Sequence, residues 1–242
     1  TLEIPASVTS VSSYAFSGCS NIATLTLNSG LQTISGYAFQ DLKITTLTVP
    51  NSVTSIGKAA FQGCNALTSI SLPFVGGSRT TSTSANTTTV FGYIFGYYYG
   101  SSGQPTGTIY QGVSGNYYYY FYIPSTLRTV TITDATGISA NAFYNCSFLT
   151  SITINSGVTT IGTNAFYGCT GITAFTVPTT VTSIGTYAFY NNSNLATISL
   201  PSTLTAIADY TFYGCNKLNN LVLPTKLRTI GQYAFNGNTA LS

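Results

Sequence analysis

The sequence predicts a repeat solenoid whose coils stack into a parallel β-sheet of short strands on one face, with few helices and one irregular insertion. The first observation is a phenylalanine that recurs at intervals of 23, 22, 82, 23, 23, 23 and 23 residues. The others are a short alternating apolar segment in each unit and a proline that often follows it. A fixed period of this length is typical of repeat architectures. The recurring residues are Phe16, Phe39, Phe61, Phe143, Phe166, Phe189, Phe212 and Phe235.

The strand of each unit is clearest between Leu195 and Leu200, where apolar residues alternate with polar ones. Such alternation is typical of a strand with one buried face, and Pro201 ends the pairing because it lacks an N–H. Units this short cannot bury their apolar side alone, so neighbouring units must stack with paired strands roughly 4.8 Å apart. We expect buried columns of like residues, one formed by the phenylalanines and another by Val11, Ile34, Ile56, Ile138, Ile161, Ile184, Ile207 and Ile230.

The period predicts a single domain over residues 1–242, with repeats at 1–73 and 123–242 and a Tyr/Gly-rich insertion at 74–122. The first part of the insertion has the composition of a flexible loop. Its second part is too apolar to hang free, so we expect a short hairpin or collapsed loop that folds back on the solenoid. Both ends of the chain fall in the middle of a repeat, which favours a piece of a longer protein whose signal and anchor lie outside it.

The amino-acid composition argues against some classes of binding partner. Seven basic and four acidic residues leave a net charge of +3, and Ser, Thr, Asn and Gly solvate the surface instead of charges. So few scattered charges do not favour nucleic acid or an anionic membrane as a partner. No apolar run approaches the roughly 20 residues of a membrane-spanning helix, so membrane insertion by this fragment is not expected.

The side-chain inventory argues against catalysis. The chain has no histidine, and its four carboxylates fall in distant units. It also lacks the glycine-rich motifs that bind nucleotides. We therefore expect no catalytic residues, no metal and no cofactor. The cysteines Cys19, Cys64, Cys146, Cys169 and Cys215 each follow a recurring phenylalanine by three places, which indicates a column of buried structural thiols.

For one pair of cysteines in that column, a disulfide bond is an alternative to free thiols. Only Cys146 and Cys169 lie in adjacent coils, where stacking could bring their Cα atoms within the roughly 4.4–6.8 Å that a disulfide requires. The other three cysteines have no neighbour of their kind.

Three surfaces are candidates for ligand contact. One is a two-column array of strand hydroxyls that includes Thr129, Thr131 and Thr153. Another is a tyrosine column, with Tyr187, Tyr210 and Tyr233 in a second column nearby. The third is the insertion. For all three the alternative is structural: solvation of a sheet face, shielding of turns, or packing of the insertion. The candidate tyrosines are Tyr144, Tyr167, Tyr190 and Tyr213 in the column and Tyr97, Tyr98, Tyr118 and Tyr119 in the insertion.

The repeat resembles the leucine-rich repeats of the Treponema pallidum type, the BspA-like family. The segment Cys64–Pro73 carries the pattern C-x-x-L-x-x-I-x-L-P, and Val181–Phe189 carries V-x-x-I-G-x-x-A-F. Departures occur where Asp41-Leu42 and Asn192 replace the usual Cys, and where Thr133–Thr136 replaces a proline-led turn.

The resemblance implies a right-handed leucine-rich-repeat coil in a secreted or cell-surface protein. It further implies a non-catalytic adhesion and protein-binding scaffold for host extracellular-matrix or cell-surface proteins. Two other functions stay open: a module that binds carbohydrate or an ordered lattice such as a polysaccharide fibre or ice, and a passive structural spacer.

Overall fold

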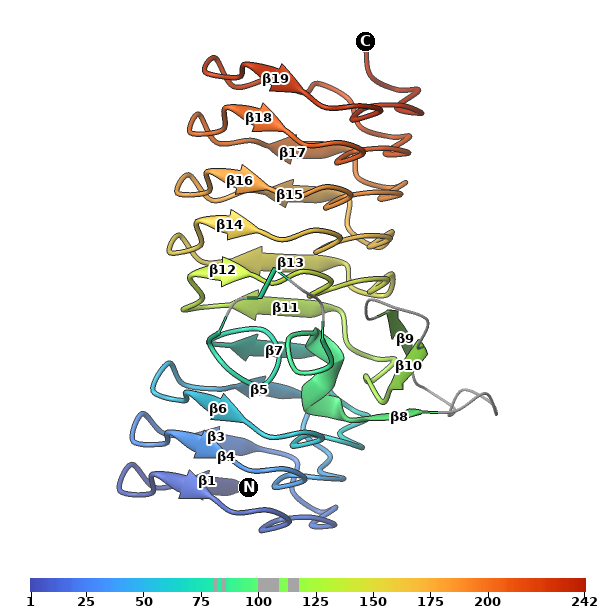
Figure 1. Cartoon of the computed structure of the whole chain (residues 1–242). Helices are drawn as coiled ribbons and strands as arrows, with labels where there is room; N and C mark the ends of the chain where they lie inside the picture. Colours follow the sequence, from blue (N-terminus) through green and yellow to red (C-terminus); the bar gives the residue numbers. More distant parts are fainter. Residues whose placement is uncertain (81, 84–85, 100–108, 113–117) are drawn as a thin grey trace.

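The protein is a stack of coils that runs from the N-terminal to the C-terminal end of an elongated body (Figure 1). The computed structural model describes residues 1–80, 82–83, 86–99, 109–112 and 118–242. Each coil except the last contributes one strand to a first ladder of parallel strands. The strands of this ladder are β1 (Leu2–Ile4), β3 (Leu25–Leu27), β5 (Thr46–Thr48), β7 (Ser69–Leu72), β11 (Thr129–Ile132), β13 (Ser151–Ile154), β15 (Ala174–Thr176) and β17 (Thr197–Ser199). The ladder is hydrogen-bonded in three sheets, β1-β3, β5-β7-β11-β13 and β15-β17.

The register of the first ladder places like residues above one another. Leu47 pairs with Ile70, and Val130 lies between Ile70 and Ile152. These inward residues are buried because the side chains of a strand alternate between its two faces. The predicted parallel solenoid of short strands is confirmed.

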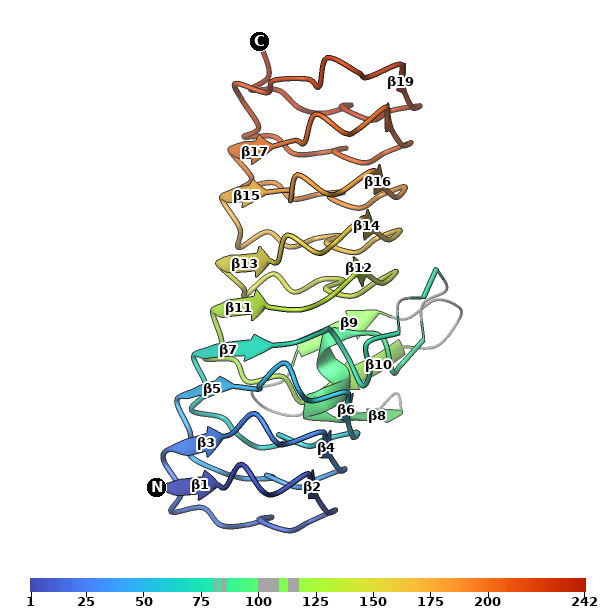
Figure 2. The same cartoon turned by 90° about the vertical axis from the view of Figure 1, so that its left-hand side faces the viewer.

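A second ladder of two-residue strands lies on another side of the coils (Figure 2). It carries the predicted isoleucine column, and Ile161 pairs with Ile184. The sequence analysis predicted the column but not its strands. It also expected Ile230 to be buried, whereas Ile230 lies in the last coil and is 52% exposed. The strands are β2 (Ser10–Val11), β4 (Thr33–Ile34), β6 (Ser55–Ile56), β12 (Gly137–Ile138), β14 (Thr160–Ile161), β16 (Ser183–Ile184), β18 (Ala206–Ile207) and β19 (Thr229–Ile230).

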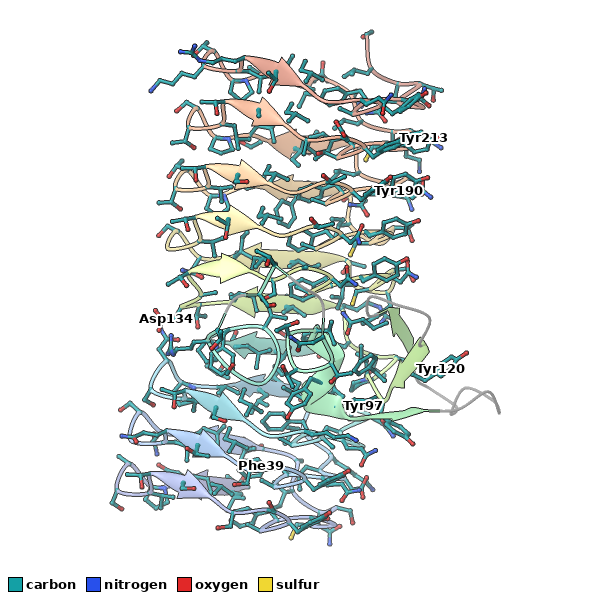
Figure 3. The ribbon with its side chains drawn as sticks, viewed as in Figure 1. Phe39, Tyr97, Tyr120, Asp134, Tyr190 and Tyr213 are labelled. Carbon is teal, nitrogen blue, oxygen red and sulfur yellow. The ribbon has the colours of Figure 1, made fainter. Side chains whose placement is uncertain are left out.

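The recurring phenylalanines form the predicted ladder inside the stack, where Figure 3 labels Phe39. Adjacent rings stack with centroids 5.1–5.8 Å apart. The rings from Phe39 to Phe212 are fully buried, and Phe16 and Phe235 near the chain ends are partly buried. This spacing falls within the range at which aromatic pairs stabilise each other beyond their burial.

The insertion completes one coil instead of separating two. Strand β7 pairs directly with β11, so the chain between them belongs to a single coil. Its 3₁₀ helix η1 (Phe91–Phe95) occupies the level of the missing ladder residue. The backbone N–H of Phe61 donates to the Ile94 carbonyl, and that of Phe91 donates to the Ala142 carbonyl. The Phe91 ring lies 5.3 Å from that of Phe143, so the core continues through the insertion.

Beyond η1 the insertion forms a small antiparallel sheet with the strand order β8-β10-β9. Its strands are β8 (Tyr97–Tyr99), β9 (Ile109–Gly112) and β10 (Tyr118–Phe121). The segment therefore folds back on the solenoid, as expected, and brings packing of its own. We call this sheet the hairpin sheet.

The first part of the insertion fills a gap in the second ladder between β6 and β12. The N–H of Ile56 donates to the carbonyl of Gly77, and the N–H of Ala140 donates to that of Ser82. The Arg79 guanidinium forms an ion pair with the Asp134 carboxylate at 2.5 Å and also donates to the Asn51 carbonyl. Arg79 thus joins two coils where Asp134 replaces the proline-led turn.

Candidate recognition surfaces

The four predicted column tyrosines form a stacked ladder, which we call the first tyrosine ladder. The ring centroids from Tyr144 through Tyr167 and Tyr190 to Tyr213 are 4.6, 4.8 and 4.8 Å apart, with interplanar angles of 12° or less. Each tyrosine follows a buried ladder phenylalanine, so its side chain leaves the core and is half-buried at the turn. Figure 3 shows Tyr190 and Tyr213 on one side of the stack.

A second tyrosine ladder runs beside the first. Tyr187 stacks on Tyr210 at 4.7 Å, and Tyr210 stacks on Tyr233 at 5.1 Å. The Tyr187 ring also meets the Tyr190 ring at 5.5 Å and 61°, so the two ladders form one aromatic surface with inclined rings. The sequence analysis missed the equivalent pair Tyr14 and Tyr37, which stack at 4.9 Å in the first two coils.

The second ladder depends on an unusual backbone conformation. Tyr187 has a φ of 59° in a turn closed by the Ala188 N–H and the Gly185 carbonyl. A positive φ at this turn position normally favours Gly or Asn, because the left-handed region costs other residues roughly 1–2 kcal/mol. Tyr210 and Tyr233 share the conformation, with φ values of 55°. The equivalent position of other coils has the same conformation, with Ala59, Asn141 and Asn164 at φ values of 60°, 57° and 55°.

Stacking determines which parts of the rings in the first tyrosine ladder are accessible to a ligand. The ring faces lie against one another, so it is the ring edges that remain for external contact. Burial, followed by the neighbouring Tyr144, raises the pKa of Tyr167, and burial also raises the pKa of Tyr190. The hydroxyl of Tyr167 also hydrogen-bonds that of Tyr144, so these two phenols are partners of each other. The surface is a row of uncharged hydroxyls on an aromatic base.

The hairpin sheet is fixed beside the first tyrosine ladder by Gln111. This side chain is fully buried; its Nε2 donates to the Ala142 carbonyl at 2.7 Å, and its Oε1 accepts from the Gly92 N–H at 2.6 Å. Nε2 also lies 3.7 Å from the Sγ of Cys146, two residues beyond Tyr144. The sequence analysis missed Gln111, because a polar residue in a Tyr/Gly-rich segment resembles a solvent-exposed one.

The candidate tyrosines of the insertion lie on the strands of the hairpin sheet. Tyr97 on β8 packs on Phe121 at 5.4 Å and carries the Lys58 ammonium 4.0 Å from its ring centroid. The structure describes only the backbone of Tyr98, Tyr118 and Tyr119. Figure 3 shows Tyr97 and Tyr120 on the same side of the stack as Tyr190 and Tyr213. We call the two tyrosine ladders and the tyrosines of the hairpin sheet together the tyrosine face.

The strand hydroxyls lie on the first ladder of strands, away from the tyrosine face. Thr129 pairs with Ser69 and Ser151, and Thr131 pairs with Ser71 and Thr153. The candidates Thr129, Thr131 and Thr153 are therefore close neighbours, partly or fully exposed.

The hydroxyl array runs over the strands β3, β5, β7, β11 and β13, and begins with the exposed Thr24 and Thr26. Next to it, the outward positions Ala174 and Thr176 of β15 include a residue without a hydroxyl. A cavity of about 200 Å³ opens between β13 and β15 and is lined by these two residues with Ser151 and Thr153. The regular part is thus a patch rather than a continuous lattice.

The cysteine column is structural. All five cysteines are free, and the four beyond Cys19 are buried. The Sγ of Cys64 donates to the carbonyl of Phe39 in the preceding coil, as Cys215 does to Phe189. Burial raises the pKa of Cys64 to about 12, so its reactive thiolate does not form near neutral pH. Among the described residues, no group of three or more His, Cys, Asp or Glu could hold a metal ion.

Asn192 occupies a cysteine position at a cost in stability. It is fully buried, and neither its Nδ2 nor its Oδ1 has a hydrogen-bond partner. A buried polar group without a partner costs about 1–3 kcal/mol. We expect Asn192→Cys to raise the free energy of unfolding by about 1–2 kcal/mol, because a thiol there would reach the Phe166 carbonyl. Urea denaturation measures this, with Cys215→Asn as the matched control that should lose stability. An Asn192→Cys protein no more stable than the parent would contradict the assignment.

The stacked coils and their turns define a leucine-rich-repeat scaffold. A protein-family model for the BspA type leucine-rich repeat region matches residues 1–90 and 114–242 in six copies. The chain belongs to this family, as its repeat pattern indicated. Among the described residues, no helix is long and apolar enough to cross a membrane.

Solved structures with a similar fold come from several bacteria. A leucine-rich repeat protein of Treponema pallidum, TpLRR, is 22% identical, with a TM-score of 0.46 over 100% of this chain and 77% of that one. A leucine-rich cell surface protein of Faecalibacterium prausnitzii is 26% identical, with a TM-score of 0.37, and this chain spans 95% of its own length and 59% of that protein. The pneumococcal vaccine antigen PcpA is 17% identical, with a TM-score of 0.37 over 99% and 60% of the two chains. A search of curated proteins finds no match.

Proposed function

We propose that the chain is a non-catalytic recognition module of a secreted or cell-surface protein and binds extracellular-matrix or host-cell surface proteins through the tyrosine face. The observation that supports this most directly is that two stacked tyrosine ladders meet in one aromatic surface, where Tyr187 contacts Tyr190 and Tyr210 contacts Tyr213. Aromatic rings supply a large contact area at a low entropy cost and are enriched at the centres of protein interfaces.

The tyrosine face is repetitive and carries little charge, which favours binding through many weak contacts. The first tyrosine ladder repeats one contact over four coils, and repeated contacts strengthen each other when a partner engages several at once. No charged residue occurs between Asp134 and Asp209, so electrostatic attraction contributes little there. Binding by this face should consequently depend weakly on salt concentration.

The test is binding to a panel of immobilised extracellular-matrix proteins by the parent chain and by two double variants. Tyr190→Ser with Tyr213→Ser should weaken binding at least about tenfold, since central aromatic contacts carry most of the energy of an interface. The matched variant, Thr131→Ala with Thr153→Ala on the strand face, should bind as the parent does. An unaffected tyrosine variant, or a panel with no binder, would contradict the proposal.

A second candidate function rests on the hydroxyl array. Thr129, Thr131 and Thr153 stand in register on adjacent strands, and a regular uncharged patch of hydroxyls is suited to an ordered polysaccharide. A glycan array and a pull-down on insoluble glycans test this function, and Thr131→Val with Thr153→Val should abolish any binding found. If the parent chain binds neither glycans nor matrix proteins, the passive spacer becomes the better account.

A further inference from the structure

We propose that Asn86, in the first part of the insertion, is an acceptor for an N-linked glycan. Asparagine followed two places later by serine or threonine, with a residue other than proline between them, is the acceptor sequence for such glycans in secreted proteins. The inference rests on the secreted location in the proposed function and adds a modification site to it. The acceptor sequence occurs at Asn86-Thr87-Thr88, Asn145-Cys146-Ser147 and Asn191-Asn192-Ser193.

The three sites differ in how their residues are buried. Asn86 and Thr88 are exposed, and Thr87 between them is half-buried. At the other two sites the middle residue, Cys146 or Asn192, is fully buried. An enzyme that engages both the asparagine and the hydroxyl two places on must also cover the residue between them. In the folded chain, only the site at Asn86 allows this.

The side chain of Asn86 is already paired with the hydroxyl of its acceptor sequence. Its Oδ1 accepts from the backbone N–H of Thr88 at 2.9 Å and from the Thr88 hydroxyl at 2.6 Å. This is the turn that asparagine side chains form with the backbone two residues further on. The amide and the hydroxyl that the modification needs are therefore held together on the surface.

The two hydrogen bonds to Oδ1 prepare Nδ2 for reaction. Hydrogen bonds to the charged form of a group favour that form, so two donors on Oδ1 make the Nδ2 proton easier to remove. In the transfer, Nδ2 forms a bond to the anomeric carbon of a glycan that is carried on a polyprenyl diphosphate. The bond between that carbon and the diphosphate oxygen breaks, the polyprenyl diphosphate leaves, and the Nδ2 proton passes to a base of the enzyme.

Backbone hydrogen bonds hold the turn at Asn86 on the solenoid. The Asn86 carbonyl accepts from the N–H of Thr89 at 3.3 Å, and the Thr88 carbonyl accepts from the N–H of Gly77 at 2.8 Å. The Gly77 carbonyl in turn accepts from the N–H of Ile56 on β6. Asn86 thus lies on the segment that fills the gap in the second ladder, and its exposed side chain can carry a bulky glycan without separating coils.

At the other two sites a glycan would press on the next coil. Asn145 and Asn191 have φ values of 56° and 54°, and each side chain lies over a glycine of the following coil. A Cβ placed on Gly168 would lie 2.4 Å from the Oδ1 of Asn145, and a Cβ on Gly214 would lie 2.4 Å from that of Asn191. Because a glycan is bulky, we expect neither asparagine to carry one in the folded protein.

The test is synthesis of the whole chain, behind a signal peptide, in eukaryotic cells that transfer N-linked glycans. The protein is recovered from the medium and from the cells and analysed by mass spectrometry before and after treatment with peptide N-glycosidase, which releases the glycan and leaves aspartate. We expect one glycan per chain, at Asn86. A protein without a glycan at Asn86, or with one at Asn145 or Asn191 instead, would overturn the inference.

Substitutions in the acceptor sequence test the role of the hydroxyl. Thr88→Ala should abolish the modification, whereas Thr88→Ser keeps a hydroxyl and should retain it. Ser193→Ala, which removes the acceptor sequence at Asn191, is the matched control and should leave the glycan in place. Circular dichroism verifies that each variant is folded. A glycan that persists in Thr88→Ala, or is lost in Thr88→Ser, would contradict the assignment.

Glycan transfer and matrix binding are measured independently. If the chain carries a glycan at Asn86 but binds no matrix protein, the modification site stands and the proposed function is wrong. If the chain binds matrix proteins through the tyrosine face while Asn86 stays unmodified, the modification site is wrong and the proposed function stands.

Discussion

Replacing Phe91 with Ala is expected to lower the free energy of unfolding by about 3–5 kcal/mol, the usual cost of removing a buried aromatic side chain. Phe91 is fully buried, stacks near Phe143 at 5.3 Å and meets Phe95 edge-on at 5.4 Å. If η1 continues the core, Phe91→Ala should cost as much as Phe166→Ala inside a regular repeat.

Urea denaturation of the two variants measures this effect. Thr83→Ala is the matched control, because Thr83 belongs to the same insertion and is exposed. Its stability should stay within about 0.5 kcal/mol of the parent, as is usual for surface substitutions. A Phe91→Ala protein that also stays within that range would mean that the insertion is not part of the core.

Raising the pH above about 9 is expected to destabilise the protein by several kcal/mol. Burial raises the pKa of Cys64 and Cys215 from 9.0 to about 12, and also raises those of Cys146 and Cys169. The folded state holds these protons more tightly than the unfolded state, so their contribution is complete below pH 9 and is lost as the pH approaches 12. Each pKa unit corresponds to 1.36 kcal/mol, which gives about 4 kcal/mol for one such thiol.

Denaturation curves between pH 8 and pH 11 measure this dependence. Cys64→Ala with Cys215→Ala should have lower stability at pH 8 but a shallower decline above pH 9, because two of the titrating groups are gone. Cys19→Ala is the control, since Cys19 is exposed, and it should keep the slope of the parent. An equal slope in the double variant would show that these thiols do not cause the alkaline loss.

The regular part of the fold could be predicted because the apolar pattern of each repeat indicates how that repeat aligns with its neighbours. The alternation around Ile198 and the recurring Phe189 fix which residues face inward, and stacking follows from the inability of one coil to bury its apolar side. The second ladder of strands could not be predicted in this way. Its strands have only two residues each, too few for alternation to be recognised.

The apolar residues of the insertion predict that it folds back on the solenoid, but its completion of a coil could not be predicted, because η1 does not follow the 23-residue spacing. Phe91 and Phe95 lie far from the 23-residue register, and their Gly- and Tyr-rich surroundings resemble no other unit. The burial of Gln111 could not be predicted from the sequence either, because its hydrogen-bond partners are backbone groups of Gly92 and Ala142 that come close to it only in the folded chain.

The tyrosine column was predictable as a surface but not as a stack. Spacing alone places Tyr167 and Tyr190 on the same side of adjacent coils. The equivalent position holds Asn141 and Asn164 in two earlier coils, also with positive φ, and asparagine favours that conformation, but nothing in the pattern indicates that the ring of Tyr187 stacks there. The orientation of the rings therefore had to come from the structure.

Partners are expected to contact the tyrosine face and not the strand face. Amide hydrogen exchange of the chain, with and without a matrix protein bound, tests it most directly. The account predicts slower exchange in the turns around Tyr167, Tyr190 and Tyr213, and unchanged exchange in β11 and β13. Protection confined to β11 and β13, with the tyrosine turns unaffected, would contradict it.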